Sequence, residues 1–243
     1  MLKSWFKGRR KAAVEYPEVS PDSELSIIGD LHGCTDLLAR ALDRIPSEKQ
    51  IICVGDYVDR GEDSSGVLKL LVERDDVICL RGNHEEMLQS FLDEPEAQGP
   101  RWLKHGGLQT LASFGVSGIT QGSKDSDLLR ARDTLKEAMG PEMIAWLSAL
   151  PLTFRSGNVA VVHAAMAPAM PIERQKRRHL LWGSSEFGKV LRTDGLWVAH
   201  GHTIVSDPVA EQGVISVDTG AYATGRLTIA NVRHGQVNFE IVT

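Results

Sequence analysis

From residue 25 onward, the apolar and polar positions of the chain alternate between two periods. Three short apolar runs are typical of buried strands: LSIIG (25–29), IICVG (51–55) and VICL (77–80). Two segments between them place apolar residues at three- and four-residue intervals, as on one face of a helix: 35–45 and 64–74. Thr35 is the expected N-cap of the first helix. This order predicts a βαβαβ unit with parallel strands.

The rest of the chain changes period twice more. From Glu85 to about Leu150 the pattern is mostly helical, with breaks at Gly and Pro. Strand patterns then return at 158–164, 196–200, 213–218, 226–232 and 236–242, the last two around a turn at His234 and Gly235. We therefore expect an α/β fold in which two sheets pack face to face, helices flank both sides, and a helical insertion separates the two halves.

Composition narrows the class of protein. With 243 residues, 42% of them hydrophobic, the chain suits one large domain over 25–243, preceded by a basic tail at 1–24. A net charge of −5 argues against nucleic acid as a partner, so any affinity for phosphate has to be local. The three cysteines lack metal-site spacing and no apolar run reaches 18 residues. We expect a cytoplasmic protein without a transmembrane segment.

The tail carries five basic residues before its first acid, Glu15, with Leu2, Trp5 and Phe6 among them. Such a segment is usually a frayed terminus. Weak contact with a membrane surface is the alternative, because apolar and basic side chains are interleaved.

Five of the predicted strands end in polar side chains of one chemical kind. They are Asp30 and His32 in GDLHG, Asp56 and Asp59 in GDYVDRG, Asn83 and His84 in RGNHE, His163 in VVHAAMAP, and His202 in AHGHT. One acidic strand end would be an ordinary turn, since Asp and Gly are common turn residues. Five such ends indicate one site, because the carboxyl ends of strands in α/β folds face a shared crevice.

The side chains of this set indicate a metal site with oxygen and nitrogen ligands, which suits Mn²⁺, Fe or Zn²⁺. The set is too large for one catalytic ion, so we expect two ions about 3.5–4 Å apart, bridged by Asp56. Gly29, Gly55 and Gly82 each precede a proposed ligand, where the missing Cβ would permit an abrupt turn.

These motifs, followed by DTGA near the C-terminus, resemble in the same order those of the phosphoprotein phosphatase family of calcineurin-like metallophosphoesterases. The resemblance is nearest to small bacterial serine/threonine phosphatases and extends from about residue 25 to the end. It implies a β-sandwich flanked by helices, and direct attack of a metal-bound water on phosphorus without a covalent intermediate.

The same resemblance implies a role for each residue. Asp30, His32 and Asp56 would hold the first ion, and Asp56, Asn83, His163 and His202 the second. Arg60 and Asn83 would contact the substrate, with the Arg60 guanidinium gripping phosphate oxygens. His84 would be the general acid and Asp59 its orienting partner. Mn²⁺ is the expected metal, with Fe and Zn²⁺ as alternatives.

The remaining histidines are not proposed as metal ligands. His105, His179 and His234 are expected to be structural or surface residues, whereas His200 could orient a ligand from behind. Two positions depart from the family pattern. Ser184 stands where many relatives have a second phosphate-binding arginine, which Arg177, Arg178 or Arg192 could replace, and Ala165 stands where HAG is usual.

We therefore expect a metal-dependent phosphatase that hydrolyses phosphate monoesters, with phosphoserine and phosphothreonine in proteins as the preferred substrates. Its partner would be a phosphoprotein or a phosphorylated small molecule. The alternative is a dinucleoside polyphosphate hydrolase, since those enzymes share GDxVDRG and GNHE. A non-catalytic phosphate-binding or scaffold protein would be expected to lack His84 or a metal ligand, and this chain has them all.

Overall fold

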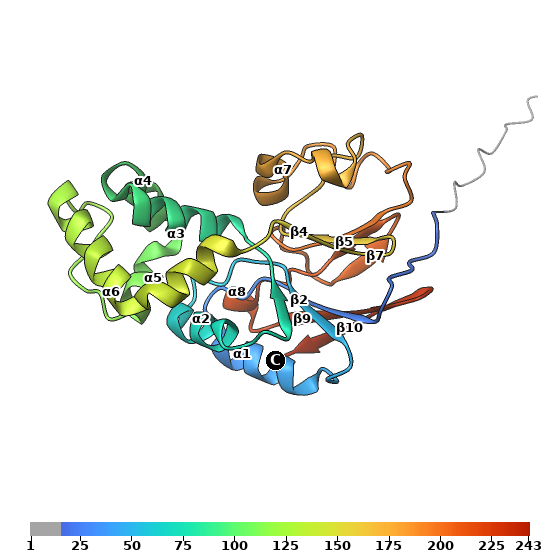
Figure 1. Cartoon of the computed structure of the whole chain (residues 1–243), viewed down its shortest axis with the longest axis horizontal. Coiled ribbons are helices and arrows are strands. Elements are labelled where there is room, and N and C mark those ends of the chain that lie inside the picture. The colour runs from blue at the N-terminus through green and yellow to red at the C-terminus, as the bar shows by residue number, and fades with distance from the viewer. Residues whose placement is uncertain (1–15) are drawn as a thin grey trace, which may run out of the picture.

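The computed structural model describes residues 16–243, and two five-stranded sheets form its centre (Figure 1). The first sheet, in the order β10-β9-β1-β2-β3, contains β1 (Leu25–Ile28), β2 (Gln50–Cys53), β3 (Val77–Cys79), β9 (Leu227–Arg233) and β10 (Gln236–Val242). The second sheet, in the order β4-β5-β6-β8-β7, contains β4 (Thr153–Ser156), β5 (Val159–Val162), β6 (Trp197–His200), β7 (Val209–Glu211) and β8 (Val214–Ser216). Strands β1, β2 and β3 run parallel, as do β5, β6 and β8.

Helices cover the sheets. The expected helical insertion separates β3 from β4 in the sequence and lies to one side of the sheets (Figure 1). The first sheet is covered by α1 (Thr35–Arg44) and α2 (Ser64–Val72). The insertion contains α3 (Asn83–Asp93), α4 (Pro95–Trp102), the π-helical turn η1 (Leu103–Gly107), α5 (Leu108–Ser113) and α6 (Asp125–Ala149). Three short elements follow: η2 (Ile172–Arg174), α7 (Arg177–Trp182) and α8 (Ala221–Thr224). The predicted helix-flanked, two-sheet α/β fold is thus confirmed.

The central strands are largely apolar because both of their faces are buried; Ser26 of β1, buried and bonded to Asn231 (2.8 Å), is an exception. In β1, Ile27 points into the layer between the sheets and Ile28 into the layer beneath the helices. In β5, Val161 likewise faces the other sheet, whereas Val162 packs with Leu180 of α7. Successive side chains of a strand point to opposite faces, so a strand between two apolar layers favours apolar residues at every position.

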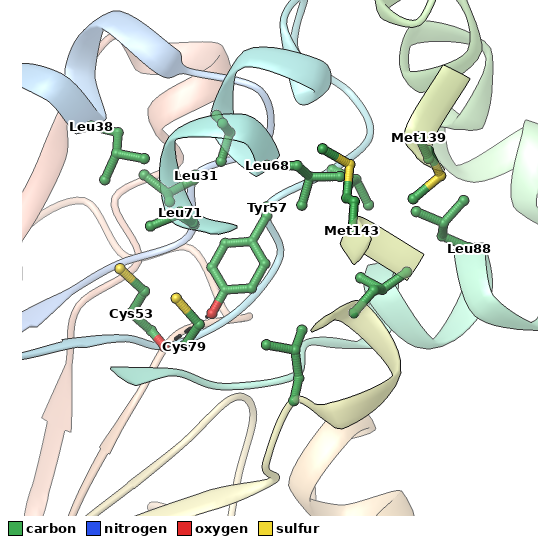
Figure 2. Packing of buried hydrophobic residues seen from close by; sticks show 14 of the residues in the cluster. Leu31, Leu38, Cys53, Tyr57, Leu68, Leu71, Cys79, Leu88, Met139 and Met143 are labelled. Atoms are coloured by element: carbon green, nitrogen blue, oxygen red, sulfur yellow. Dashed lines mark hydrogen bonds between the residues drawn. The ribbon is translucent and has the colours of Figure 1, made fainter. Parts of the chain in front are cut away.

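The loop after β2 is anchored in the helical layer by Tyr57 (Figure 2). The ring is fully buried beside Leu68, and its hydroxyl donates hydrogen bonds to the carbonyl oxygens of Leu80 (2.6 Å) and Cys53 (3.3 Å). A tyrosine buried with its hydroxyl satisfied is a rigid anchor. Its neighbours Asp56 and Asp59 are therefore held at a constant position relative to the sheet.

Three local features differ from the sequence prediction. Cys34, not Thr35, occupies the N-cap of α1, and the Thr35 hydroxyl instead donates to the Asp63 carbonyl (3.0 Å). The short strands β4 and β7 were not predicted. Both lie at sheet edges, where a strand needs only one pairing partner and no long apolar run.

Residues 16–24 lie against the second sheet. The Tyr16 hydroxyl donates to the Leu196 carbonyl (2.8 Å), the Trp197 indole N–H donates to the Pro17 carbonyl (2.8 Å), and Val19 is buried. The rest of the predicted tail, including the suggested membrane-contacting residues, lies outside the described residues. Within 16–243, no helix has the length and apolar character needed to cross a membrane.

Candidate active site

The predicted residues meet at one edge of the sandwich, and Asp56 is at their centre. Its Oδ2 lies 3.5 Å from Nε2 of His32, and its Oδ1 lies 3.4 Å from Nε2 of His163. Two groups of possible metal ligands, each with its ligand atoms within 4.8 Å of one another, share this carboxylate: His32, Asp56 and His84; Asp56, His163 and His202. An oxygen on each side of one carboxyl group suits a bridge between two ions.

The backbone at this edge is held in an uncommon conformation. Of six non-glycine residues with positive φ between residues 16 and 243, five belong to the predicted site. They are His32, Asp56, Asp59, Arg60 and His202, with φ between 42° and 69°. Such a conformation costs about 1–3 kcal/mol per residue and persists only where the surroundings enforce it. Its concentration here marks the edge as functional.

One residue that enforces this conformation, Glu85, was not predicted. The fully buried carboxylate accepts backbone N–H bonds from Asp56 (2.8 Å), Tyr57 (2.7 Å) and Gly82 (2.8 Å). Burial raises the pKa of Glu85 to about 7, helped by the Asp56 charge and opposed by these bonds. Glu85 thus joins the loop after β2 to the start of α3. An acid three residues after a helix N-cap was the signal for it in GNHE.

The glycines beside the ligands serve two purposes. Gly55 adopts φ 116°, which fits the expected turn. Gly29 and Gly82 do not have positive φ; a Cβ would lie 2.4 Å from the Val217 carbonyl oxygen at Gly29 and 2.2 Å from Asp56 Oδ1 at Gly82. Their role is close approach between the backbone and neighbouring oxygens, which only glycine permits.

The imidazoles of the site are prepared to act as metal ligands. Nδ1 of His32 lies 2.8 Å from the Val58 carbonyl, and Nδ1 of His163 lies 3.2 Å from the Val54 carbonyl. A carbonyl only accepts, so the His32 proton lies on Nδ1 and the lone pair of its Nε2 points to Asp56. In His163 both ring nitrogens face acceptors, and a cation beside Nε2 would place the proton on Nδ1. Burial lowers the pKa of His32 to about 3 and that of His163 to about 4, so both are neutral at pH 7.

Two further contacts fit a cation. Nε2 of His163 and Oδ1 of Asn83 are only 2.8 Å apart, as expected for two ligands that converge on one ion. Asp30 accepts a bond from the His202 N–H (3.0 Å) through Oδ2, but its buried Oδ1 has no hydrogen-bond partner. Burial, together with the charges of Asp218 and Asp56, raises the pKa of Asp30 well above its usual value. A divalent ion would compensate these crowded carboxylates.

His84 and Asp59 form a buried pair beside this cluster. Nδ1 of His84 lies 2.7 Å from Oδ2 of Asp59, and Asp59 also accepts from the Trp102 indole (3.0 Å) and the Thr110 hydroxyl (2.6 Å). Burial lowers the pKa of His84, but Asp56 and Asp59 more than offset it, so the net shift is upward. Its Nε2 is buried without a partner, 3.9 Å from Asp56 Oδ2. The pair can therefore hold and direct a proton.

Arg60 lies at the exposed rim of the site. Its guanidinium carbon is 5.2 Å from the centre of the Tyr222 ring, and Nη1 donates to the Tyr222 hydroxyl (3.4 Å). That ring also packs edge-on against His32, 5.2 Å away. No ion pair of Arg60 occurs in the described part of the chain, so its fork of donors can meet a phosphate.

The other histidines lie away from the ligand cluster. His105 bonds to the Arg101 carbonyl, and His234 lies in the exposed turn between β9 and β10. His200 faces the outer side of the second sheet, bonded to Ser216 (2.9 Å) and packed against Phe187. No bond from its ring to a ligand side chain is found among residues 16–243, so an orienting role receives no support.

Two of the arginines suggested as replacements at the Ser184 position are engaged elsewhere. Arg177 pairs with Glu86 of α3. Arg192 is buried and pairs with Asp194. Neither is poised to contact a phosphate at the ligand cluster.

Comparison with known proteins agrees with this geometry. The family model for calcineurin-like phosphoesterases matches residues 25–206, three quarters of the chain. The chain belongs to that family. Asymmetrical bis(5'-nucleosyl)-tetraphosphatase PrpE of Oceanobacillus iheyensis is 29% identical, with 84% of this chain and 87% of that protein covered. Serine/threonine-protein phosphatase 1 of Salmonella typhimurium is 28% identical, with 85% and 91% covered.

The calcineurin-like fold is also seen among solved structures. A crystal structure provisionally assigned as a diadenosine tetraphosphatase has a TM-score of 0.62 at 21% identity, covering 94% of this chain and 99% of that one. The protein is thus a phosphoesterase by family, and its residues fit a divalent metal site.

Proposed function

We propose that this protein is a serine/threonine protein phosphatase that hydrolyses phosphate monoesters with a pair of divalent ions, normally Mn²⁺. The His84–Asp59 pair is the observation that carries the proposal. Alkoxides of serine and threonine are poor leaving groups and need a proton, and general acid help is worth about 10²- to 10⁴-fold. The Asp59 carboxylate has no exposed surface and accepts hydrogen bonds from His84, Trp102 and Thr110. A buried carboxylate held in this way beside the His84 imidazole suits that need.

The proposed ligand sets divide around Asp56. Asp30, His32 and Asp56 would hold one ion; Asp56, Asn83, His163 and His202 would hold the other. When bound, such ions supply Lewis-acid stabilisation of phosphoryl oxygens and lower the pKa of water. His84 itself belongs to one of the two compact groups, but its Nδ1 is bonded to Asp59 and its pKa is raised, which favours the role of acid.

The protein's own residues would bind and protonate the substrate. Arg60 would hold phosphate oxygens from the rim, with its orientation limited by Tyr222. His84 would donate its Nε2 proton to the departing oxygen while Asp59 stabilises the imidazolium. Trp102 and Thr110 would keep the Asp59 carboxylate from turning away.

A dinucleoside polyphosphate hydrolase is the second candidate, supported by the name of the Oceanobacillus relative. The Salmonella relative, of nearly equal identity, supports the first candidate. The chemistry of the leaving group separates them. Anhydride cleavage releases a phosphate, which needs less protonation than an alkoxide. Both kinds of enzyme share the motifs that carry Asp59 and His84, so the candidates are separated by how strongly turnover depends on this pair.

The test compares a phosphoserine peptide with diadenosine tetraphosphate on the same Mn²⁺-loaded protein, measuring kcat/KM for each. We expect the peptide to be the better substrate, and Asp59→Asn to reduce its turnover more than that of the dinucleotide. Clearly faster wild-type turnover of the dinucleotide would overturn the first candidate in favour of the second.

A further inference from the structure

A cavity of about 330 Å³ opens on the outer side of the second sheet. One wall is the loop that follows α7, which contributes Phe187, Val190 and Leu191. The opposite wall is formed by β7 and β8, including Val209 and Val214. Its volume lies at the lower end of the range for small-ligand sites, about 300–1,000 Å³. The cavity can therefore hold a single side chain of the aliphatic or aromatic type.

The cavity adjoins the candidate metal ligands through the chain itself. Ala164, which lines it, directly follows His163, and Thr203, which also lines it, directly follows His202. Consecutive Cα atoms are about 3.8 Å apart, so the cavity wall begins one residue from two proposed ligands. A substrate with its phosphate at the ions would place its neighbouring groups within reach of this opening.

Exposed apolar side chains form part of the cavity wall. Every large hydrophobic side chain that is well exposed among residues 16–243 comes from the segment 182–222: Trp182, Val190, Leu191, Ile204, Val209 and Tyr222. Val190, Leu191 and Val209 line the cavity, and Tyr222 packs against Arg60 and His32 at the ligand cluster. Three exposed apolar side chains at one cavity are typical of a binding site.

The buried polar side chains of the lining already have partners. His200 bonds to Ser216 (2.9 Å), and Arg192 bonds to Asp194 (3.0 Å) and to the Ala167 carbonyl (3.1 Å). A nucleobase carries several polar edge groups that need partners when buried, whereas an aliphatic side chain needs none. Lys189, Glu211 and Gln212 also line the cavity but are exposed to water, so the buried part of the lining favours an apolar group.

We propose that this cavity is a specificity subsite that binds one apolar side chain of a phosphoprotein substrate, close in sequence to the phosphorylated residue. The inference rests on the proposed protein phosphatase function. An extended chain advances about 3.3 Å per residue, so three residues on either side of the phosphoserine reach roughly 10 Å. The subsite would select among phosphorylated segments, while the metal cluster acts on the phosphate common to all.

The experiment uses phosphoserine peptides in a background of Gly, Ala and Gln. One leucine is placed at each position from three before to three after the phosphoserine, and kcat/KM is measured on Mn²⁺-loaded full-length protein. At one position or more we expect about a tenfold gain over the leucine-free peptide, as for an apolar group entering an apolar pocket. In Leu191→Gln and in Val209→Gln, the ratio between the two peptides should fall towards one.

Ile204→Gln is the matched control, because Ile204 is 47% exposed and follows Thr203 in the chain but does not line the cavity. Its peptide ratio should remain that of the wild type. Taking the ratio cancels any general loss from altered folding or metal content.

Each other result has a distinct meaning. If no phosphopeptide is hydrolysed, the proposed function itself fails. If the peptides are hydrolysed without a leucine preference, or the preference survives both cavity variants, the subsite is wrong while the function stands. A loss confined to diadenosine tetraphosphate in those variants would also overturn the inference, since the cavity would then hold a nucleoside.

Discussion

Replacing His84 with asparagine tests the proposed acid most directly. The substitution removes the imidazole but keeps the backbone N–H of residue 84, which donates to Asp56 Oδ1 (3.0 Å). The proposed bridging carboxylate therefore retains its backbone bond. We expect both ions to stay bound in His84→Asn, because neither ring nitrogen is a proposed ligand: Nδ1 bonds to Asp59, and Nε2 is the proposed proton donor.

The size of the effect should depend on the leaving group. Loss of general acid help should reduce kcat for a phosphoserine peptide by about 10²- to 10⁴-fold. For p-nitrophenyl phosphate, whose phenolate leaves without a proton, the reduction should be much smaller. Asp59 keeps its bonds from Trp102 and Thr110, so the stability cost should be only about 1–3 kcal/mol for the lost partner.

The assay measures kcat on both substrates and metal content by elemental analysis, at a temperature where the variant is folded. Asp59→Asn should show the same dependence on the leaving group more mildly, because the imidazole remains but loses its charged partner. His105→Asn is the control, since its ring bonds only to the Arg101 carbonyl in the described structure.

Two outcomes would refute this reasoning. Equal losses on the two substrates would remove His84 as the general acid. Loss of one metal equivalent would show instead that His84 is a ligand, together with His32 and Asp56, with which it forms a compact group.

Three other predictions concern single contacts. Asp56→Asn should lower metal content and activity on all substrates together, as checked by elemental analysis; full occupancy of both ions would exclude the bridge. Ser184→Arg should lower KM for a phosphopeptide if a phosphate contact is missing there, because it would add a contact in both ground and transition states; an unchanged KM would place residue 184 away from the phosphate. The hydrogen bond and charge of Arg177 lower the pKa of Glu86 below its usual 4.5, so this pair stabilises the fold above that value and less as pH falls through the lowered pKa. The Tm difference between wild type and Glu86→Gln should therefore be present at pH 7 and shrink below pH 4.5 in thermal melts; a constant difference would contradict the ion pair.

Much of the fold, and the meeting of these polar side chains at one edge, could be predicted from the sequence. Strands buried on two faces need continuous apolar runs, and parallel strands bring their carboxyl ends to one edge, so residues after those runs had to meet. Asp56 and His163 illustrate this: 107 positions apart in the sequence, they lie 3.4 Å apart in the structure.

The hydrogen bonds that hold those residues in place could not be predicted from the sequence, because they depend on the tertiary structure. Trp102 and Thr110 reach Asp59 from the helical insertion, 43 and 51 positions away, and nothing local in their helices indicates that contact. A helical pattern specifies which face is buried but not which buried polar group a side chain will meet.

The two histidines of AHGHT show the same limit at close range. His200 ends β6 and faces the outer side of the sheet, whereas His202 turns towards Asp56 because its backbone adopts φ 64° beyond the strand. Strand alternation places residues two apart on the same face, so sequence period alone could not separate them. Contacts with Asp30, which accepts a hydrogen bond from the His202 N–H, decide where the chain turns, and that carboxylate follows strand β1 of the other sheet.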